Sequence, residues 1–112
     1  MKVFTFLILS VLLLLFEISG SAQVIQAGGN FSLFICSNQS LYAWGYNGSG
    51  QLGDGTTQLR YTPVKISAIT NVSIVSAGGD HTLALKTDGT FWVWGYNNNG
   101  QLGDGTTVNK NT

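Results

Sequence analysis

The hydrophobic and polar positions divide the chain into two unlike parts. Residues 3–16 form an apolar run that only Thr5 and Ser10 interrupt; a lysine precedes it and small residues follow it. A positive start, a short apolar core and a small-residue end are typical of a secretory signal peptide. The run is too short for a stable membrane span, which needs about 20 predominantly apolar residues. We predict a signal peptide over residues 1–22, cleaved after Ala22, and therefore a secreted or extracytoplasmic protein.

From residue 23 onward the polar and apolar positions follow the two-residue period of β-strands. In Thr82–Lys86 apolar residues alternate with less apolar ones, and Phe91–Trp94 is a run of aromatic and β-branched residues. The dipeptide Asp88-Gly89 between them predicts a hairpin turn, because glycine adopts positive φ angles without steric cost. The first half of the chain has Ser37–Ser40 at the same place, a softer turn that asparagine can begin.

Three further strands are predicted from their apolar composition. Val24–Ala27 and Ile74–Ala77 are read as inner strands that each end at a Gly-Gly pair. Glycine there indicates a close approach of two backbones rather than a phosphate site. Tyr61–Ile66 is read as a short edge strand with Pro63 at its start. No apolar period of 3.6 residues is sustained beyond the leader, so the predicted fold class is all-β.

The part of the chain after the leader is a repeat with a period of 50 residues. Aligning Val24–Thr62 with Ile74–Thr112 without a gap gives 17 identical residues in 39 positions. The eight residues Gly50–Thr57 recur unchanged as Gly100–Thr107. Repeats of this length are typical of solenoids, propellers and arrays.

The motifs of the second unit resemble a known repeat. Ala77–Leu85 is followed by the Asp-Gly turn, then by Trp92–Asn97 and Gly100–Thr107. This series is similar to the regulator of chromosome condensation repeat. The resemblance implies a β-propeller whose blades are four-stranded antiparallel sheets, about seven in a ring. We divide the chain into repeat 1 at residues 23–73 and a truncated repeat 2 at residues 74–112.

The resemblance gives the recurring positions a structural role in the repeat. They are Gly28, Gly29, Trp44, Gly45, Asn47, Gly50, Gln51, Leu52 and Gly53 in repeat 1, and Gly78, Gly79, His81, Trp94, Gly95, Asn97, Gly100, Gln101, Leu102 and Gly103 in repeat 2. It further implies that His81 bonds a neighbouring turn. Repeat 1 departs from the pattern where Asn30-Phe31-Ser32 replaces Asp-His-Thr.

Two repeats do not close a ring of about seven blades. Open blades expose strand edges and apolar faces, and repeat arrays generally need three or more units. We therefore expect the chain to be the N-terminal piece of a longer propeller. The alternative is a short chain that closes a ring from several copies.

Charge and cysteine content exclude several classes of protein. Five basic and five acidic residues give a net charge of zero, and charged residues are 9% of the chain. Nucleic-acid binding needs clustered lysine and arginine, so we predict no nucleic-acid partner. The single cysteine, Cys36, excludes an internal disulfide and a cysteine-cluster zinc site. Its apolar surroundings in the sequence predict that it is buried.

Candidate chemistry is sparse. His81 is the only histidine, and together with Asp80 and Thr82 it mimics a Ser-His-Asp grouping. Catalysis also needs a positioned nucleophile and an oxyanion site, so we interpret His81 as structural. Asp54-Gly55 and Asp104-Gly105 predict turns, because no spaced series of acidic calcium ligands follows them. The glycine-rich loops lack the Gly-Lys-Ser/Thr ending of a phosphate-binding loop. We assign no catalytic residue, no metal ligand and no cofactor.

Two function classes remain, and neither is an enzyme. The first is a protein–protein interaction module in which propeller loops bind another protein. The alternative is a carbohydrate- or cell-wall-binding propeller that uses exposed aromatic side chains and asparagine-rich loops such as Asn97–Asn99. Aromatic residues at strand spacing more often fill the core of a sheet. The residues concerned are Tyr42, Trp44, Tyr46, Trp92, Trp94 and Tyr96.

Overall fold

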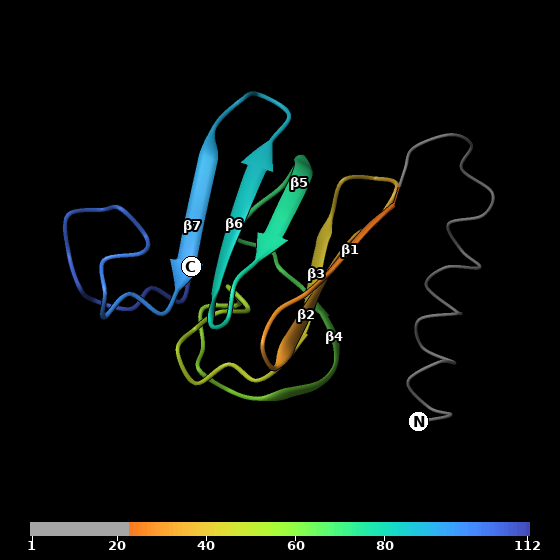
Figure 1. The fold of residues 1–112 in the computed structure, drawn as a ribbon. Helices are drawn as coiled ribbons and strands as arrows, with labels where there is room; N and C mark the ends of the chain where they lie inside the picture. Colours follow the sequence, from red (N-terminus) through yellow and green to blue (C-terminus); the bar gives the residue numbers. More distant parts are fainter. Residues whose placement is uncertain (1–22) are drawn as a thin grey trace.

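The computed structural model describes residues 23–112, which form strands, turns and loops (Figure 1). The predicted signal peptide lies outside the described residues. Within the described part of the chain, no helix is long and apolar enough to cross a membrane.

Seven strands form two antiparallel sheets, as the alternating pattern predicts. The first sheet has the order β1 (Val24–Ala27), β2 (Phe31–Ile35), β3 (Leu41–Gly45) and β4 (Arg60–Lys65); the second has the order β5 (Val72–Ala77), β6 (His81–Lys86) and β7 (Phe91–Gly95). Strands that follow one another in sequence are neighbours in each sheet, so both sheets are meanders. The all-β fold class and the four-stranded blade are confirmed.

The second sheet contains the beginning of a fourth strand pairing. Gly95 and Lys110 form an isolated antiparallel bridge. Gly45 and Arg60 pair at the equivalent place in the first sheet. The two repeats therefore follow the same path as far as this bridge.

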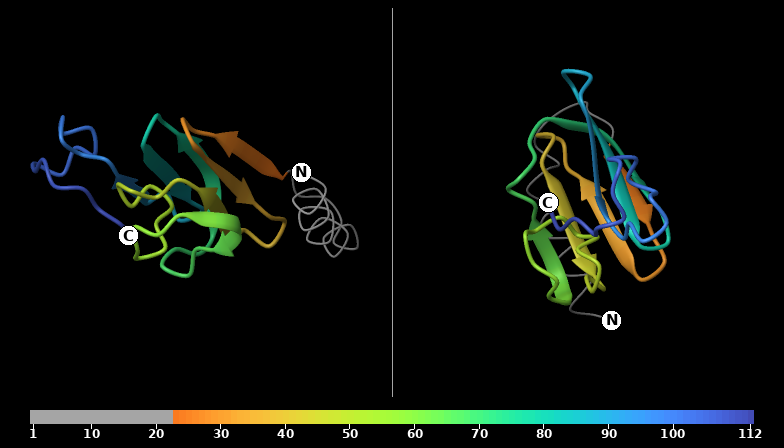
Figure 2. Two further views of the ribbon diagram at one scale, coloured as in Figure 1. Left: turned by 90° about the horizontal axis from the view of Figure 1, so that it is seen from below. Right: turned by 90° about the vertical axis from the view of Figure 1, so that its left-hand side faces the viewer.

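The core lies between the two sheets, which form adjacent layers (Figure 2). Alternate residues of β2 are buried because successive side chains of a strand point to opposite faces. They pack with residues of β3 against side chains from the second sheet, among them Val75, Ala84 and Trp94. Neither repeat buries its apolar face by itself, so the core exists only where one repeat meets the other.

The prediction for Pro63 was wrong in position. β4 begins at Arg60, so the proline is the fourth residue of the strand rather than near its start. The register shifts between Ala43 and Gly45 on the neighbouring strand, which leaves irregular pairing opposite the proline. A residue without a backbone N–H is tolerated there because β4 is an edge strand and the pairing is interrupted.

The prediction for the aromatic side chains is confirmed only in part. Trp44 and Trp94 are buried, whereas Trp92 and Tyr46 are 41% and 48% exposed. Cys36 is buried, as predicted.

Several glycines have no room for a side chain, among them Gly29 and Gly45. The N–H of Gly29 donates to the carbonyl oxygen of Gly79 at 3.1 Å, and a Cβ on Gly29 would lie 2.6 Å from that oxygen. Gly45 has a φ of 107°, and a Cβ there would lie 2.5 Å from the carbonyl oxygen of Asn30. The first contact joins the inner strands of the two repeats, and the second closes repeat 1 on itself.

We expect Gly45→Ala to lower the free energy of unfolding by about 3 kcal/mol or more, because it combines a left-handed φ with a backbone clash. Gly89→Ala is the matched control. Its φ is also positive, at 84°, but a Cβ would meet nothing within 4 Å. The control should lose only about 1 kcal/mol. Chemical denaturation of the two variants measures the difference, and equal losses would contradict the clash.

Candidate functional site

Two long loops lie at the same end of the two sheets (Figure 1). Residues 46–59 connect β3 to β4, and residues 96–112 follow β7. The short turns at residues 36–40 and 87–90 lie at the opposite end.

Each long loop is closed around one fully buried asparagine. The side-chain amide of Asn47 donates to the carbonyl oxygen of Thr56 at 2.9 Å, and its Oδ1 accepts from the N–H of Leu52 at 3.0 Å. Asn97 repeats both bonds with Thr106 and Leu102, at 3.0 and 2.9 Å. A buried amide that uses its donor and its acceptor holds both arms of its loop. The loops are therefore fixed from within.

A carboxylate completes each loop. Burial alone would raise the pKa of Asp54, but hydrogen bonds from Thr56, Arg60 and Asn47 outweigh it and hold the pKa below its ordinary value. The Arg60 Nε lies 2.7 Å from Asp54 Oδ2. Hydrogen bonds from the hydroxyl and then the N–H of Thr106 lower the pKa of Asp104 to about 2. Both aspartates therefore serve as hydrogen-bond acceptors within turns.

The loop of repeat 1 is joined to the sheet of repeat 2 through Gln51, which is fully buried. Its Nε2 donates to Asp80 Oδ1 at 3.0 Å. Its backbone carbonyl oxygen accepts from the Thr82 hydroxyl at 2.7 Å and from the Trp94 indole N–H at 2.9 Å. This set of bonds is called the Gln51 lock below.

The structure separates the residues that mimic a catalytic grouping. Asp80 and Thr82 both bind Gln51, whereas His81 points to the other face of β6 and its imidazole packs on Gly78. The backbone carbonyl oxygen of His81 accepts from the N–H of Gly78 at 2.8 Å, so His81 bonds the neighbouring Gly-Gly turn through its backbone, while its ring packs on that turn. Phe31 packs on Gly28 in the same way in repeat 1. An aromatic ring at this position needs only a glycine beneath it, which explains why phenylalanine can replace histidine.

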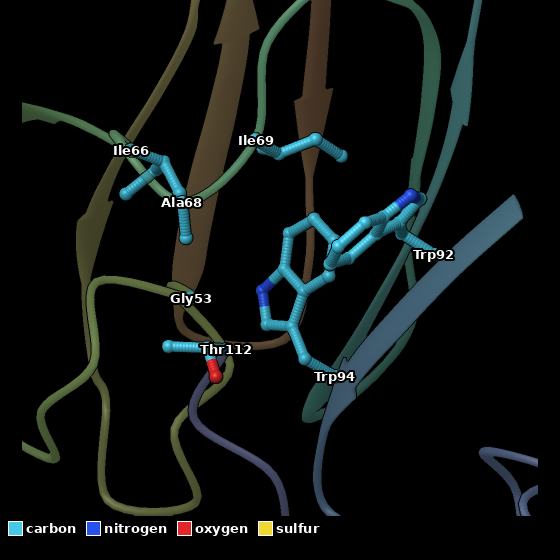
Figure 3. Close-up of a pocket in the computed structure, with 7 residues that line it drawn as sticks. All are labelled: Gly53, Ile66, Ala68, Ile69, Trp92, Trp94 and Thr112. Atoms are coloured by element: carbon cyan, nitrogen blue, oxygen red, sulfur yellow. The ribbon is translucent and has the colours of Figure 1, made fainter. Parts of the chain in front are cut away.

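Two hollows lie between the repeats. The first, of about 10 Å³, has room for no more than one water molecule, and Trp92, Trp94 and Ile69 line it (Figure 3). The second, of about 180 Å³, lies between the two loops. Its lining is polar and comes from both repeats: Gly48, Ser49, Thr57, Asn109, Lys110 and Asn111. Among residues 23–112, no three His, Cys, Asp or Glu side chains gather as they would around a metal ion.

The sequence did not predict Asp80 and Thr82 as partners of Gln51. It also did not predict the threonines that bind the turn aspartates, although these carry a local signal. The triplet Asp-Gly-Thr occurs at residues 54–56, 88–90 and 104–106, and each aspartate accepts from its threonine hydroxyl. This is the sequence pattern of a side-chain-closed turn.

The two packed meanders, joined through glycine contacts and the Gln51 lock, define a β-propeller repeat protein. The chain belongs to the regulator of chromosome condensation (RCC1) repeat family. One profile of the family matches residues 38–85, and a second matches residues 24–51 and 72–101.

Solved structures of similar fold include yeast RCC1 (Prp20) bound to Kap60 and human WBSCR16. The first has 21% identity and a TM-score of 0.72, over 80% of this chain and 23% of the other. The second has 28% identity and a TM-score of 0.63, over 83% and 25%. A structure of Prp20p from Saccharomyces cerevisiae, described with its binding to Gsp1p and histones, also has 21% identity and a TM-score of 0.72, over 80% and 24%. The chain spans about a quarter of the length of these proteins.

We expect Thr106→Val to raise the pKa of Asp104 from about 2 toward its ordinary value of 3.8, because the hydroxyl bond is the largest cause of the shift. A carboxyl group whose pKa is lowered by folding stabilises the fold at pH values above its ordinary pKa. This contribution is lost as the pH falls through the pKa of the folded state. Side-chain carboxyl NMR gives the titration midpoint. Asp88, which is held by Thr90, should titrate as in the unchanged protein. An unchanged midpoint for Asp104 would contradict the assignment.

We expect Gln51→Glu to destabilise the protein by about 3 kcal/mol at pH 7, because it places a carboxylate at a fully buried position, beside the carboxylate of Asp80. The loss should be smaller at pH 4, where one carboxyl can be protonated. Gln101→Glu is the same change at the equivalent position of repeat 2, where none of the carboxylates in residues 23–112 is bonded to the side chain. It should cost less than about 0.5 kcal/mol. Thermal unfolding at both pH values measures this, and equal losses in the two variants would overturn the role of the lock.

Proposed function

We propose that the protein is exported and that it acts, without catalysis, by binding another protein through the loops at residues 46–59 and 96–112. The observation that carries this proposal is the rigid loop pair at one end of the sheets. A surface that is ordered before binding loses less conformational entropy when a partner docks. The apolar run at residues 3–16 supports export.

The loops also expose side chains suited to a protein partner. Tyr46, Leu59 and Val108 are large and exposed, and most other residues of the two loops are polar or glycine. Exposed aromatic and apolar side chains within a polar rim are typical of protein interfaces. One similar structure is the yeast protein bound to Kap60, and another is described with its binding to Gsp1p and histones. They support the class of partner and not its identity.

A carbohydrate ligand is the second candidate. The polar hollow of about 180 Å³ presents hydroxyl, amide and ammonium groups. The Tyr46 ring lies over Gly48 at its rim. An aromatic ring beside convergent polar groups suits a sugar.

To test the proposal, the full chain is expressed in the cells that produce it, with a photoreactive amino acid at Asn98 in the loop. The matched control carries it at Thr87, which is exposed at the opposite end. We expect the recovered protein to be exported and to begin at residue 23. We also expect a discrete protein adduct from position 98 and none from position 87.

Protein retained inside the cell would contradict export. Equal adducts from the two positions, or no adduct from either, would contradict binding through the loops. Binding of the unmodified protein to a glycan array, lost in Tyr46→Ala, would replace the protein partner with a sugar.

A further inference from the structure

Asn-x-Ser triplets occur at residues 30–32, 38–40, 47–49 and 71–73. Such a triplet, with no proline in the middle, is the acceptor sequence for N-linked oligosaccharides in secreted proteins. The sugar is attached to the side-chain nitrogen of the asparagine and is bulky. An acceptor in the folded protein therefore needs an Nδ2 that is exposed and that no structural hydrogen bond uses. These two properties separate the triplets.

Asn47 has neither property. It is fully buried, and its Nδ2 donates to the carbonyl oxygen of Thr56 at 2.9 Å and to Asp54 Oδ1 at 3.1 Å. A sugar on this nitrogen would take one of its two donor hydrogens and would need space inside the closed loop. A chain whose loop at residues 46–59 is closed therefore carries no glycan at Asn47.

Asn38 has both properties. It is exposed in the turn between β2 and β3. Its Oδ1 accepts from the N–H of Ser40 at 3.1 Å and from the Cys36 thiol at 2.6 Å. Its Nδ2 donates to none of residues 23–112. The turn therefore uses only the oxygen of this side chain.

Repeat 2 shows that the oxygen alone is sufficient for this turn. Asp88 stands at the position equivalent to Asn38, and its Oδ1 accepts from the N–H of Thr90 at 2.9 Å. A carboxylate has no nitrogen, so this turn forms without one. A sugar on Asn38 Nδ2 leaves Oδ1 as an acceptor. The modification is therefore compatible with the folded turn.

Asn71 is the second exposed asparagine at this end of the sheets (Figure 1). Its side chain makes no hydrogen bond within residues 23–112, and its backbone carbonyl oxygen accepts from the N–H of Thr87 at 2.8 Å. The N–H of Val72 donates to the carbonyl oxygen of Gln39 at 3.0 Å. The triplets at residues 38–40 and 71–73 therefore lie side by side where the first sheet meets the second.

We propose that the exported protein carries N-linked oligosaccharides on Asn38 and Asn71 and none on Asn47; the inference rests on the export proposed above. A transferase of the secretory pathway moves the oligosaccharide from a lipid pyrophosphate to Nδ2. The bond between the sugar C1 and Nδ2 forms as the bond between C1 and the pyrophosphate oxygen breaks. Nδ2 loses one proton to a base of the transferase, and the lipid pyrophosphate leaves.

The two glycans stand at the end of the sheets opposite the loops at residues 46–59 and 96–112. Bulky hydrophilic chains there restrict protein contacts at the turn end and leave the loops accessible. The remaining triplet, at residues 30–32, lies toward the loops, because the carbonyl oxygen of Asn30 accepts from the N–H of Tyr46. The proposal does not involve it, and it stays unchanged in every variant below.

The test is expression of the full chain in a eukaryotic secretory cell line. Peptide N-glycosidase in heavy-oxygen water then converts each glycosylated asparagine into a labelled aspartate, and mass spectrometry reads each position separately. We expect the label at Asn38 and Asn71 and none at Asn47 in the secreted protein.

Ser40→Ala should remove the label at Asn38, because it removes the hydroxyl that completes the triplet and keeps the N–H that holds the turn. Ser40→Thr is the matched control and should keep the label, since threonine also completes the triplet and repeat 2 has Thr90 at this position. Asn71→Asp should lower the number of glycans by one. Aspartate tolerates the positive φ of 57° at this residue.

A second version of each variant carries an established secretory leader in place of residues 1–22. Entry into the pathway with that leader alone would contradict export by the chain's own leader, and the label at Asn38 and Asn71 would still report on the acceptors. Absence of the label at either position in protein that has entered the pathway would overturn the assignment of that position. Label at Asn47 in the secreted, folded protein would overturn the selection by burial.

Discussion

Gln51 connects the loop of repeat 1 to the sheet of repeat 2. The apolar core and the backbone bond between Gly29 and Gly79 are further contacts between the repeats. Gln51 is fully buried, so each of its polar groups needs a partner, and it finds them in Asp80, Thr82 and Trp94. These bonds are directional, whereas the apolar contacts of the core are not. The core supplies most of the driving force, and the lock determines the register in which the two sheets meet.

The two copies of the loop motif have the same local structure but differ in burial. Gln51 and Gln101 lie in identical eight-residue segments, and the internal loop bonds of the two are alike. Of the two, only Gln51 is fully buried, because the sheet of repeat 2 packs against it. Leu41 and Phe91 differ in the same way. The local structure therefore comes from the motif, while burial comes from the neighbouring repeat.

The strands, the hairpins and the family could be predicted because they depend on local alternation and on a long motif. The Gln51–Asp80 contact could not, since it joins residues 29 positions apart without a spacing rule. The sequence did not show that His81 contacts its turn through a backbone hydrogen bond and ring packing on Gly78, both of which Phe31 repeats with Gly28. Trp92 and Trp94 have the spacing of one face, yet only Trp94 is covered, and the pattern does not distinguish them.

The identical and the variable loop residues have different tasks. Gly50–Thr57 and Gly100–Thr107 contain the buried leucine and the turn aspartate that close each loop around its asparagine. The flanking positions differ between the repeats: Gly48 and Ser49 become two asparagines, and Leu59 becomes Asn109. Some of these line the polar hollow, and Asn109 also helps to hold its loop, because its Oδ1 accepts from the N–H of Asn97 at 2.8 Å. The residues of the identical segments make the hydrogen bonds that fix the loop conformation. Any selectivity of the loop surface for a binding partner therefore has to come from the flanking positions.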